Sequence, residues 1–238
     1  MRSFFVGIEY AGKSTLIDLL TEYYHRLKLP THDDDHFTIP DRTLSPESRA
    51  LMMDFPDDVK ERMQRMQINY HIGIIRNCTN PMISGWYIEE AIYSEIYGSD
   101  PDSPYYENYI YRAQTTYEAE VYEMHLPDIA LIHVTASDEA IRERMEANPH
   151  EYEIIKAKDI PEIKRRFEEE VEKSVFTRTG KKVVIDTTDK TPEESLDELL
   201  AVTDPLVTFG ELALRSLPIP DGDYDVRYEN GVRKMIAR

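Results

Sequence analysis

The sequence predicts a three-layer α/β/α fold built around a parallel β-sheet, with a small β-hairpin near the C-terminus. Short apolar segments of strand-like composition alternate along the chain with longer segments in which apolar residues recur at helical spacing. A glycine-containing loop joins the first apolar segment to the first helical one. Because strands joined by crossover helices pair in parallel, helices are expected on both faces of the sheet.

Residues 7–14, Gly-Ile-Glu-Tyr-Ala-Gly-Lys-Ser, match the phosphate-loop pattern G-x-x-x-x-G-K-[ST] at every fixed position. The apolar run before the loop and the helix after it are the context that such a loop requires. Its glycines let backbone N–H groups approach a phosphate, and the helix N-terminus favours an anion. The pattern predicts that Lys13 contacts the β- and γ-phosphates and that Ser14 holds Mg²⁺. The residues expected to bind the nucleotide are Gly7, Glu9, Ala11, Gly12, Lys13, Ser14 and Thr15.

The first helix is expected to run from Lys13 to about residue 29, and three aspartates follow it between two histidines. Asp33 and Asp35 are predicted to orient or deprotonate an acceptor hydroxyl, and Asp34 to hold Mg²⁺, directly or through water. The same residues also suit a transition-metal site. A solvated acidic turn is the alternative without a function, since most charge runs are solvated.

Residues 45–78 have a helical pattern that contains three candidate anion-binding arginines, Arg62, Arg65 and Arg76. A buried strand is predicted over residues 81–87. Trp86, Glu89 and Glu90 come where this strand ends, and strand ends in a parallel sheet face the ligand crevice. They are therefore site candidates. The alternative is ordinary packing followed by a helix start, where glutamates are favoured.

A core strand is predicted over residues 127–134, and Ser137 is expected to cap a helix over residues 138–147. This helix carries Arg142 and Arg144, which are expected to close over the phosphates together with a lid near residues 148–159.

Residues 161–177 are expected to form one further helix, residues 182–186 the last core strand, and residues 191–194 the start of the last regular helix. The main domain is thus predicted over residues 1–203. A C-terminal extension over residues 204–238 is predicted to contain a hairpin that turns at Asn230-Gly231.

The chain has 238 residues, of which 41% are hydrophobic and 31% charged, and its net charge is −18. This charge argues against a long nucleic-acid track, which needs many lysine and arginine contacts to phosphates. No apolar run reaches the length of a membrane helix, and the first strand begins too early to leave room for a leader peptide. A cytoplasmic protein is expected. A small-molecule acceptor is the expected partner, and the sequence leaves a homodimer open.

From about residue 3 to residue 202 the chain resembles the thymidylate kinase branch of the nucleoside and nucleotide monophosphate kinases, within the P-loop NTPases. The likeness rests on the phosphate loop and on three further segments in matching order. Residues 82–87 occupy the place of the strand that ends in Asp-Arg-Tyr, and residues 127–131 resemble the next strand, before an Arg-x-Arg helix. Residues 183–186, followed by Thr-Pro-Glu-Glu, resemble the last strand. The resemblance implies a P-loop kinase fold and an ATP- and Mg²⁺-dependent reaction.

Two departures from this family concern the acceptor. The family's Asp-Arg pair falls on Gly85 and Trp86, so the arginine that grips a monophosphate is missing. The aspartate run at residues 33–35 instead resembles the uridine and nicotinamide riboside kinases, in which a carboxylate activates a hydroxyl. Glu9 matches the family's carboxylate inside the loop, which touches the sugar. The expected function is therefore phosphoryl transfer from ATP to a small nucleoside- or nucleotide-like acceptor, at an altered acceptor site.

Two other functions stay open. The first is a true monophosphate kinase, with Arg42, Arg62, Arg65 or Arg76 in place of the missing arginine. The second is a nucleotide-binding regulatory module without turnover. A GTPase switch is disfavoured, because the chain has no Asn-Lys-x-Asp motif.

Overall fold

A computed structural model describes most of the chain. The described residues are 1–35, 44–100, 103, 121–126, 128–150, 153–217, 224–229 and 232–237. At positions 35, 57, 61, 64, 65, 67, 68, 224–229 and 232–237 the description is of the backbone alone.

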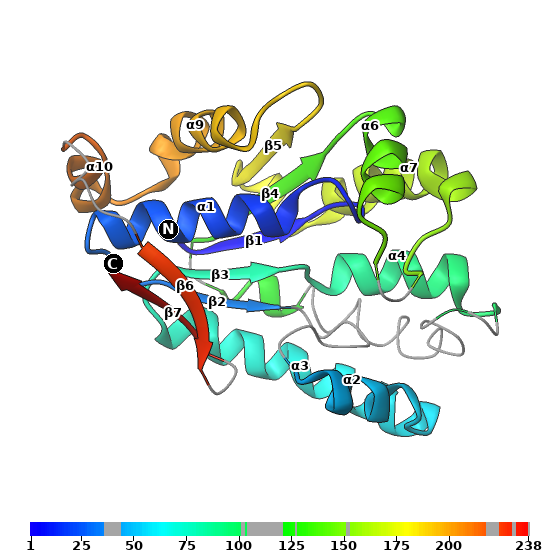
Figure 1. Cartoon of the computed structure of the whole chain (residues 1–238). Helices are drawn as coiled ribbons and strands as arrows, with labels where there is room; N and C mark the ends of the chain where they lie inside the picture. The colour runs from blue at the N-terminus through cyan, green and yellow to red at the C-terminus, as the bar shows by residue number, and fades with distance from the viewer. Residues whose placement is uncertain are drawn as a thin grey trace.

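The core is a parallel sheet, as the sequence predicts, and its five strands lie in the order β2-β3-β1-β4-β5 (Figure 1). The strands are β1 (Ser3–Val6), β2 (His32–Asp35), β3 (Pro81–Ser84), β4 (Ala130–Thr135) and β5 (Lys182–Asp186). All side chains of β1 and β3 are buried, which is typical of strands covered on both faces. β1 pairs with β3 on one side and β4 on the other, so their carboxyl ends meet at one edge. A ligand crevice is expected at such a switch point.

Helices surround the sheet and account for most of the remaining described chain (Figure 1). They are α1 (Lys13–Arg26), α2 (Pro46–Met53), α3 (Asp57–Asn77), α4 (Tyr87–Tyr97), α6 (Asp138–Ala147), α7 (Ile160–Lys173), α8 (Val175–Arg178), α9 (Pro192–Thr203) and α10 (Phe209–Arg215), with short turns η1 (Ala157–Asp159) and η2 (Asp204–Leu206). α1 packs against α9, β1 and β3, while α4 packs against α7 and α8 against β4. The cap predicted at Ser137 of α6 is confirmed, since its side chain accepts a backbone N–H of that helix. Ser45 and Thr191 cap α2 and α9 in the same way.

The helix expected over residues 161–177 is in fact two helices, because the chain turns out of α7 at Ser174. The Ser174 hydroxyl donates to the Glu123 carboxylate at 3.0 Å and accepts the N–H of Phe176 at 3.2 Å. Glu123 also accepts the N–H of Val175, at 2.9 Å. A buried carboxylate from a distant part of the chain therefore caps α8, and no local periodicity signals this break.

The expectation that α9 is the last regular helix is wrong, since α10 follows it. The Thr208 side chain accepts the N–H of Glu211 at 3.2 Å and caps this helix. The Thr-x-x-Glu spacing is a known helix-start signal, so the sequence did contain the information.

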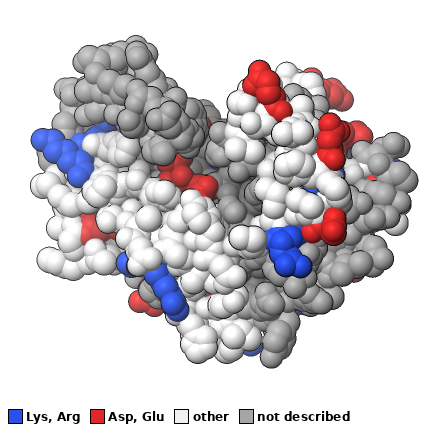
Figure 2. Space-filling model, turned by 90° about the horizontal axis from the view of Figure 1, so that it is seen from below, with Lys and Arg blue, Asp and Glu red and all other residues white. Residues whose placement is uncertain are grey.

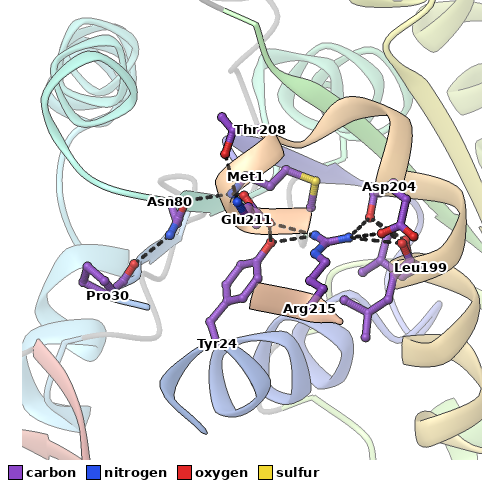
Figure 3. Close-up of polar contacts among 11 residues, drawn as sticks. Met1, Tyr24, Pro30, Asn80, Leu199, Asp204, Thr208, Glu211 and Arg215 are labelled. Carbon is purple, nitrogen blue, oxygen red and sulfur yellow. Dashed lines mark hydrogen bonds and ion pairs between the residues drawn. The ribbon is translucent and has the colours of Figure 1, made fainter. Parts of the chain in front are cut away.

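A buried polar cluster fastens α10 to the rest of the molecule, and Figure 3 shows its side chains converging on Glu211. The Glu211 carboxylate accepts from the Tyr24 hydroxyl at 2.5 Å, from Arg215 at 2.9 Å and from the Met1 amino group at 2.6 Å. Arg215 also donates to Asp204, at 3.1 Å. Burial raises the pKa of Glu211, but the neighbouring amino group, Tyr24 and Arg215 outweigh burial and hold this pKa below its ordinary value.

Replacing Glu211 with glutamine is expected to lower the free energy of unfolding by about 3 kcal/mol at pH 7, because buried positive groups lose their counter-charge. A carboxylate with a lowered pKa stabilises the fold above its unfolded pKa, and this contribution disappears as the pH falls through its folded pKa. The difference between wild type and Glu211→Gln should therefore shrink below about pH 4. Urea unfolding at pH 7 and pH 3.5 measures both values.

The control for this prediction is Glu172→Gln, which removes the exposed partner of Lys182. It should change the free energy of unfolding by at most about 0.5 kcal/mol. A pH-independent difference for Glu211→Gln would contradict the assignment of a charged Glu211.

The backbone of the C-terminal segment contains two antiparallel strands, β6 (Tyr224–Glu229) and β7 (Val232–Ala237), as the Asn-Gly pattern predicts. They form a sheet of their own, in which Glu229 pairs with Val232. None of the helices in the described part of the chain is long and apolar enough to cross a membrane.

Candidate active site

The loop between β1 and α1 turns tightly at two glycines. Gly7 has a φ of 151°, and a Cβ atom built on it would lie 2.0 Å from the carbonyl oxygen of Val134 in β4. Gly12 has a φ of 99°, in the left-handed region, and caps α1. Only glycine fits both positions without strain, the first because β4 comes so close and the second because of its dihedral. Neighbouring strand packing thus fixes the shape of the loop.

Lys13 lies at the first position of α1 and is 6% exposed. Its ammonium group donates to the Gly7 carbonyl at 2.5 Å and forms ion pairs with Glu89 at 3.2 Å and Glu9 at 3.5 Å. The N–H of Gly7 donates to the same oxygen of Glu89 at 3.2 Å. The lysine that the sequence assigns to the phosphates is therefore held inside the loop by backbone and carboxylate oxygens.

A cavity of about 540 Å³ opens beside the N-terminus of α1. Several residues assigned to the nucleotide by the sequence line it: Glu9, Gly12, Lys13, Ser14, Thr15 and Arg144. Gly7 and Ala11 are not among the lining residues; the Gly7 carbonyl accepts Lys13 at 2.5 Å, and the Ala11 carbonyl accepts the Thr187 hydroxyl at 2.8 Å. The cavity has the size of a small-ligand pocket.

Arg144 bridges the loop and the segment after β5. Its guanidinium group donates to the Tyr10 carbonyl at 3.0 Å, to the Thr187 hydroxyl at 3.0 Å and to the Thr187 carbonyl at 3.0 Å. Arg142, predicted beside it, pairs instead with Asp138 at 3.9 Å and is not among the cavity-lining residues. The structure therefore brings one arginine of the Arg-x-Arg pair to the cavity.

Tyr10 connects the loop to the beginning of the segment expected to form a lid. Its hydroxyl accepts the N–H of His150 at 3.0 Å, and the two rings meet edge-on at 4.6 Å. His150 also approaches Glu9, at 3.6 Å. Burial raises the pKa of Tyr10 despite the hydrogen bond from His150. Residues 151–152 of the expected lid lie outside the described residues.

Sequence reasoning did not single out Tyr10, Thr187 or Lys190, which also line the cavity. Thr187 and Lys190 come within four residues of the end of β5, at the carboxyl edge of the sheet where ligand-binding residues gather, so their position was the available signal. Tyr10 occupies a free position of the loop pattern, and its φ of 66° is unusual for a residue with a side chain.

The aspartate run forms the end of β2, where Asp35 pairs with Ser84 of β3. Since neighbouring strands lie about 4.8 Å apart, this end of β2 is about 10 Å from the end of β1. Asp34 lies 4.0 Å from the buried His71 of α3. The side chain of Asp35 and residue His36 lie outside the described residues. The predicted acceptor carboxylates are thus at the carboxyl edge of the sheet, two strands from the loop.

Gly85 and Trp86 take the place of the Asp-Arg pair, and Trp86 is fully buried. Its ring stacks on Phe4 of β1 with centroids 4.2 Å apart, and its indole N–H donates to Glu123 at 3.1 Å. Burial raises the pKa of Glu123, while hydrogen bonds from Val175, Trp86 and Ser174 act in the opposite direction. The residue that replaces the arginine is therefore part of the hydrophobic core.

Replacing Trp86 with arginine is expected to lower the free energy of unfolding by about 4 kcal/mol or more, because it buries a charge against Phe4. Trp86→Phe should cost only about 1–3 kcal/mol, since it keeps the stacked ring and loses the hydrogen bond to Glu123. Urea unfolding measures both values, and ATP binding to Trp86→Phe should equal that of wild type. An arginine variant as stable as wild type would show that this position is not committed to the core.

The donor side offers oxygen ligands of the kind that Mg²⁺ prefers, the Ser14 hydroxyl and the carboxylates of Glu9 and Glu89. Within the described residues, no group of three histidine, cysteine, aspartate or glutamate side chains is arranged to hold a metal. This donor set suits Mg²⁺ that is bound mainly through nucleotide phosphates. On the face drawn in Figure 2, the described lysine and arginine side chains lie in separate groups among acidic ones.

The fold and the loop define a class. This chain has a thymidylate-kinase-like nucleotide kinase fold, with its phosphate loop at the carboxyl edge of the sheet. The thymidylate kinase of Candida albicans is similar with a TM-score of 0.59 and 14% identity, over 85% of this chain and 90% of its own. The deoxyadenosine kinase of M. mycoides with bound dATP is similar with a TM-score of 0.57 and 15% identity, over 86% of this chain and 100% of its own. No protein-family model and no curated protein sequence matches the chain.

Proposed function

We propose that this chain transfers the γ-phosphoryl group of ATP, with Mg²⁺, to a small nucleoside- or nucleotide-like acceptor. The observation that carries this proposal is the cavity at the N-terminus of α1, which Lys13, Ser14 and Arg144 line together. A helix N-terminus and a lysine at the same cavity favour a polyphosphate. The similar solved structures are kinases that act on nucleosides and nucleotides, which supports phosphoryl transfer in general.

On the donor side, Lys13 and the loop N–H groups bind the β- and γ-phosphates. Lys13 is already positioned by the Gly7 carbonyl and exchanges its carboxylate partners for phosphate oxygens. Arg144, fixed by Tyr10 and Thr187, lines the same cavity and adds positive charge beside the phosphates. Ser14 would help to hold Mg²⁺, which when bound would neutralise charge on the β- and γ-phosphates.

On the acceptor side, Asp33 and Asp35 orient or deprotonate a hydroxyl, Asp34 binds Mg²⁺ directly or through water, and Glu9 contacts the acceptor. Arg142 would reach the phosphates only by leaving its pair with Asp138 and turning toward the cavity, which it does not line. A neutral hydroxyl acceptor is favoured over a monophosphate, because Trp86 in the core replaces the arginine that would bind the monophosphate. Arg76 is one of the arginines considered in place of the missing one, and its guanidinium group donates to the His125 carbonyl at 3.2 Å.

The test is a panel of acceptors with radiolabelled ATP and Mg²⁺. Deoxynucleosides, ribonucleosides and their monophosphates are each incubated with the purified chain, and labelled products are separated by chromatography. Transfer to at least one free nucleoside is the expected result. Transfer to monophosphates alone would establish the monophosphate kinase alternative. ATP binding without transfer to any member would favour a regulatory module.

A further inference from the structure

Two carboxylates flank the one lysine of the phosphate loop. Glu89 lies 3.2 Å from the Lys13 ammonium group and Glu9 lies 3.5 Å from it. Both distances are to the group that must meet the phosphates of the nucleotide. The positive charge of Lys13 is therefore already matched by negative charge before any phosphate arrives.

Glu89 is aimed at the loop by the fold. It lies in the first turn of α4, where its N–H donates to the Trp86 carbonyl at 3.0 Å. α4 begins at the carboxyl end of β3, which pairs with β1, so its first turn lies beside the loop that leaves β1. The Glu89 carboxylate accepts the N–H of Gly7 at 3.2 Å, and the residue is only 5% exposed. A charge so placed is screened little by solvent and acts strongly on a neighbouring anion.

The residue next to Glu89 in α4 is also acidic, and it is more deeply buried. Glu90 is fully buried, and its pKa lies well above the ordinary value, first because of burial and then because of the negative charge on Glu89. Glu9 adds a second carboxylate at the wall of the cavity, where its own N–H donates to the Tyr93 hydroxyl of α4 at 3.2 Å. α4 therefore contributes both the buried carboxylate and a support for the second one.

We propose that Glu89, with Glu9, makes nucleotide binding depend on Mg²⁺, so that the loop accepts the magnesium complex of ATP and rejects metal-free ATP. This inference rests on the proposed function, because Glu9 and Lys13 line the donor cavity and Glu89 contacts that lysine. The physical reason is electrostatic: the carboxylates repel the full charge of the free triphosphate, and a divalent cation cancels part of that charge. At the end of β3 this chain has Gly85, where the thymidylate kinase branch has an aspartate. Glu89, in the first turn of α4, thereby supplies a carboxylate on the donor side of the site.

The experiment measures ATP affinity by isothermal titration calorimetry in excess Mg²⁺ and in excess EDTA. Wild type should bind ATP at least about 100-fold more tightly with Mg²⁺ than without it. Glu89→Gln should reduce this ratio by about tenfold or more, chiefly by tightening the binding of metal-free ATP. Glu89→Asp, which keeps the charge, should retain most of the ratio. Glu9→Gln should reduce the ratio by a smaller factor, since Glu9 is more exposed.

The matched control is Glu95→Gln, on the same helix, which removes an exposed partner of Arg166 and should leave the ratio unchanged. If Glu89→Gln does not fold, as judged by circular dichroism, then Glu9→Gln and Glu89→Asp still test the proposal. If Glu89→Gln changes both affinities by the same factor, Glu89 only supports Lys13 and the inference about Glu89 is overturned. An unchanged ratio in both folded Glu89→Gln and Glu9→Gln would overturn the whole inference, while ATP binding by wild type would leave the proposed function standing. Absence of any binding by wild type would overturn the proposed function as well.

Discussion

Replacing Lys13 with alanine is expected to lower the rate of phosphoryl transfer from ATP by about 10²–10³-fold or more. The ammonium group is the positive side chain that the loop itself brings to the β- and γ-phosphates, and removing one such stabilising group typically costs about 3–4 kcal/mol in the transition state. The measurement is the transfer rate with the best acceptor of the panel. A variant that transferred phosphate at the wild-type rate would contradict the proposed function.

The same substitution also affects stability, and the test must separate the two effects. Alanine at position 13 leaves the carboxylate of Glu89 buried without its ion pair, which typically costs about 3–5 kcal/mol. The double variant Lys13→Ala/Glu89→Gln removes both charges and should recover most of this loss in urea unfolding. It should stay inactive, since the lysine is still absent. Recovery of stability without activity would assign the lost rate to the missing ammonium group.

Replacing Gly7 with alanine is expected to lower the free energy of unfolding by about 4 kcal/mol or more, which is an exceptionally large effect for one methyl group. The added Cβ would lie 2.0 Å from the Val134 carbonyl oxygen, which belongs to a core strand and cannot move aside alone. The φ of 151° adds strain for any residue with a side chain. Thermal or urea unfolding measures the loss, and ATP binding should disappear with it.

Gly73→Ala is the control for that prediction. Gly73 lies inside α3, and a Cβ atom there would meet no atom within 4 Å. Alanine should therefore stabilise the chain by about 0.5–1 kcal/mol, because it restricts the unfolded chain and favours helix. If Gly7→Ala were tolerated as well as Gly73→Ala, the close approach of β4 to the loop would be wrong.

The donor half of the candidate site was open to sequence analysis because its signal is local. Gly7, Gly12, Lys13 and Ser14 stand at fixed spacings in one short segment, and that spacing carries the geometry. The parallel sheet with helices on both faces could be expected as well, since apolar strands alternate with helices along the chain. The cap at Ser137 was equally readable, because capping depends on adjacent residues.

The acceptor half of the candidate site was harder to predict from the sequence, because its contacts join segments that are far apart in the chain. The sequence placed Asp33 to Asp35 at the edge of the sheet, and the register of β2 against β3 gives their distance from the loop. The sequence marked Trp86 and Glu89 as site candidates without separating packing from function. In the structure Trp86 stacks in the core and Glu89 pairs with Lys13.

The sequence by itself determined that this chain has a phosphate loop between a core strand and a helix, and that an α/β/α sheet carries it. These features follow from local spacing and periodicity, which act within a few residues. Only the tertiary structure decided that the loop lysine lies between Glu9 and Glu89, that Trp86 belongs to the core, and that α10 is fastened through Glu211 and Arg215. These contacts depend on strand order and on the rotation of each helix about its axis, and the energy of packing the whole core sets both.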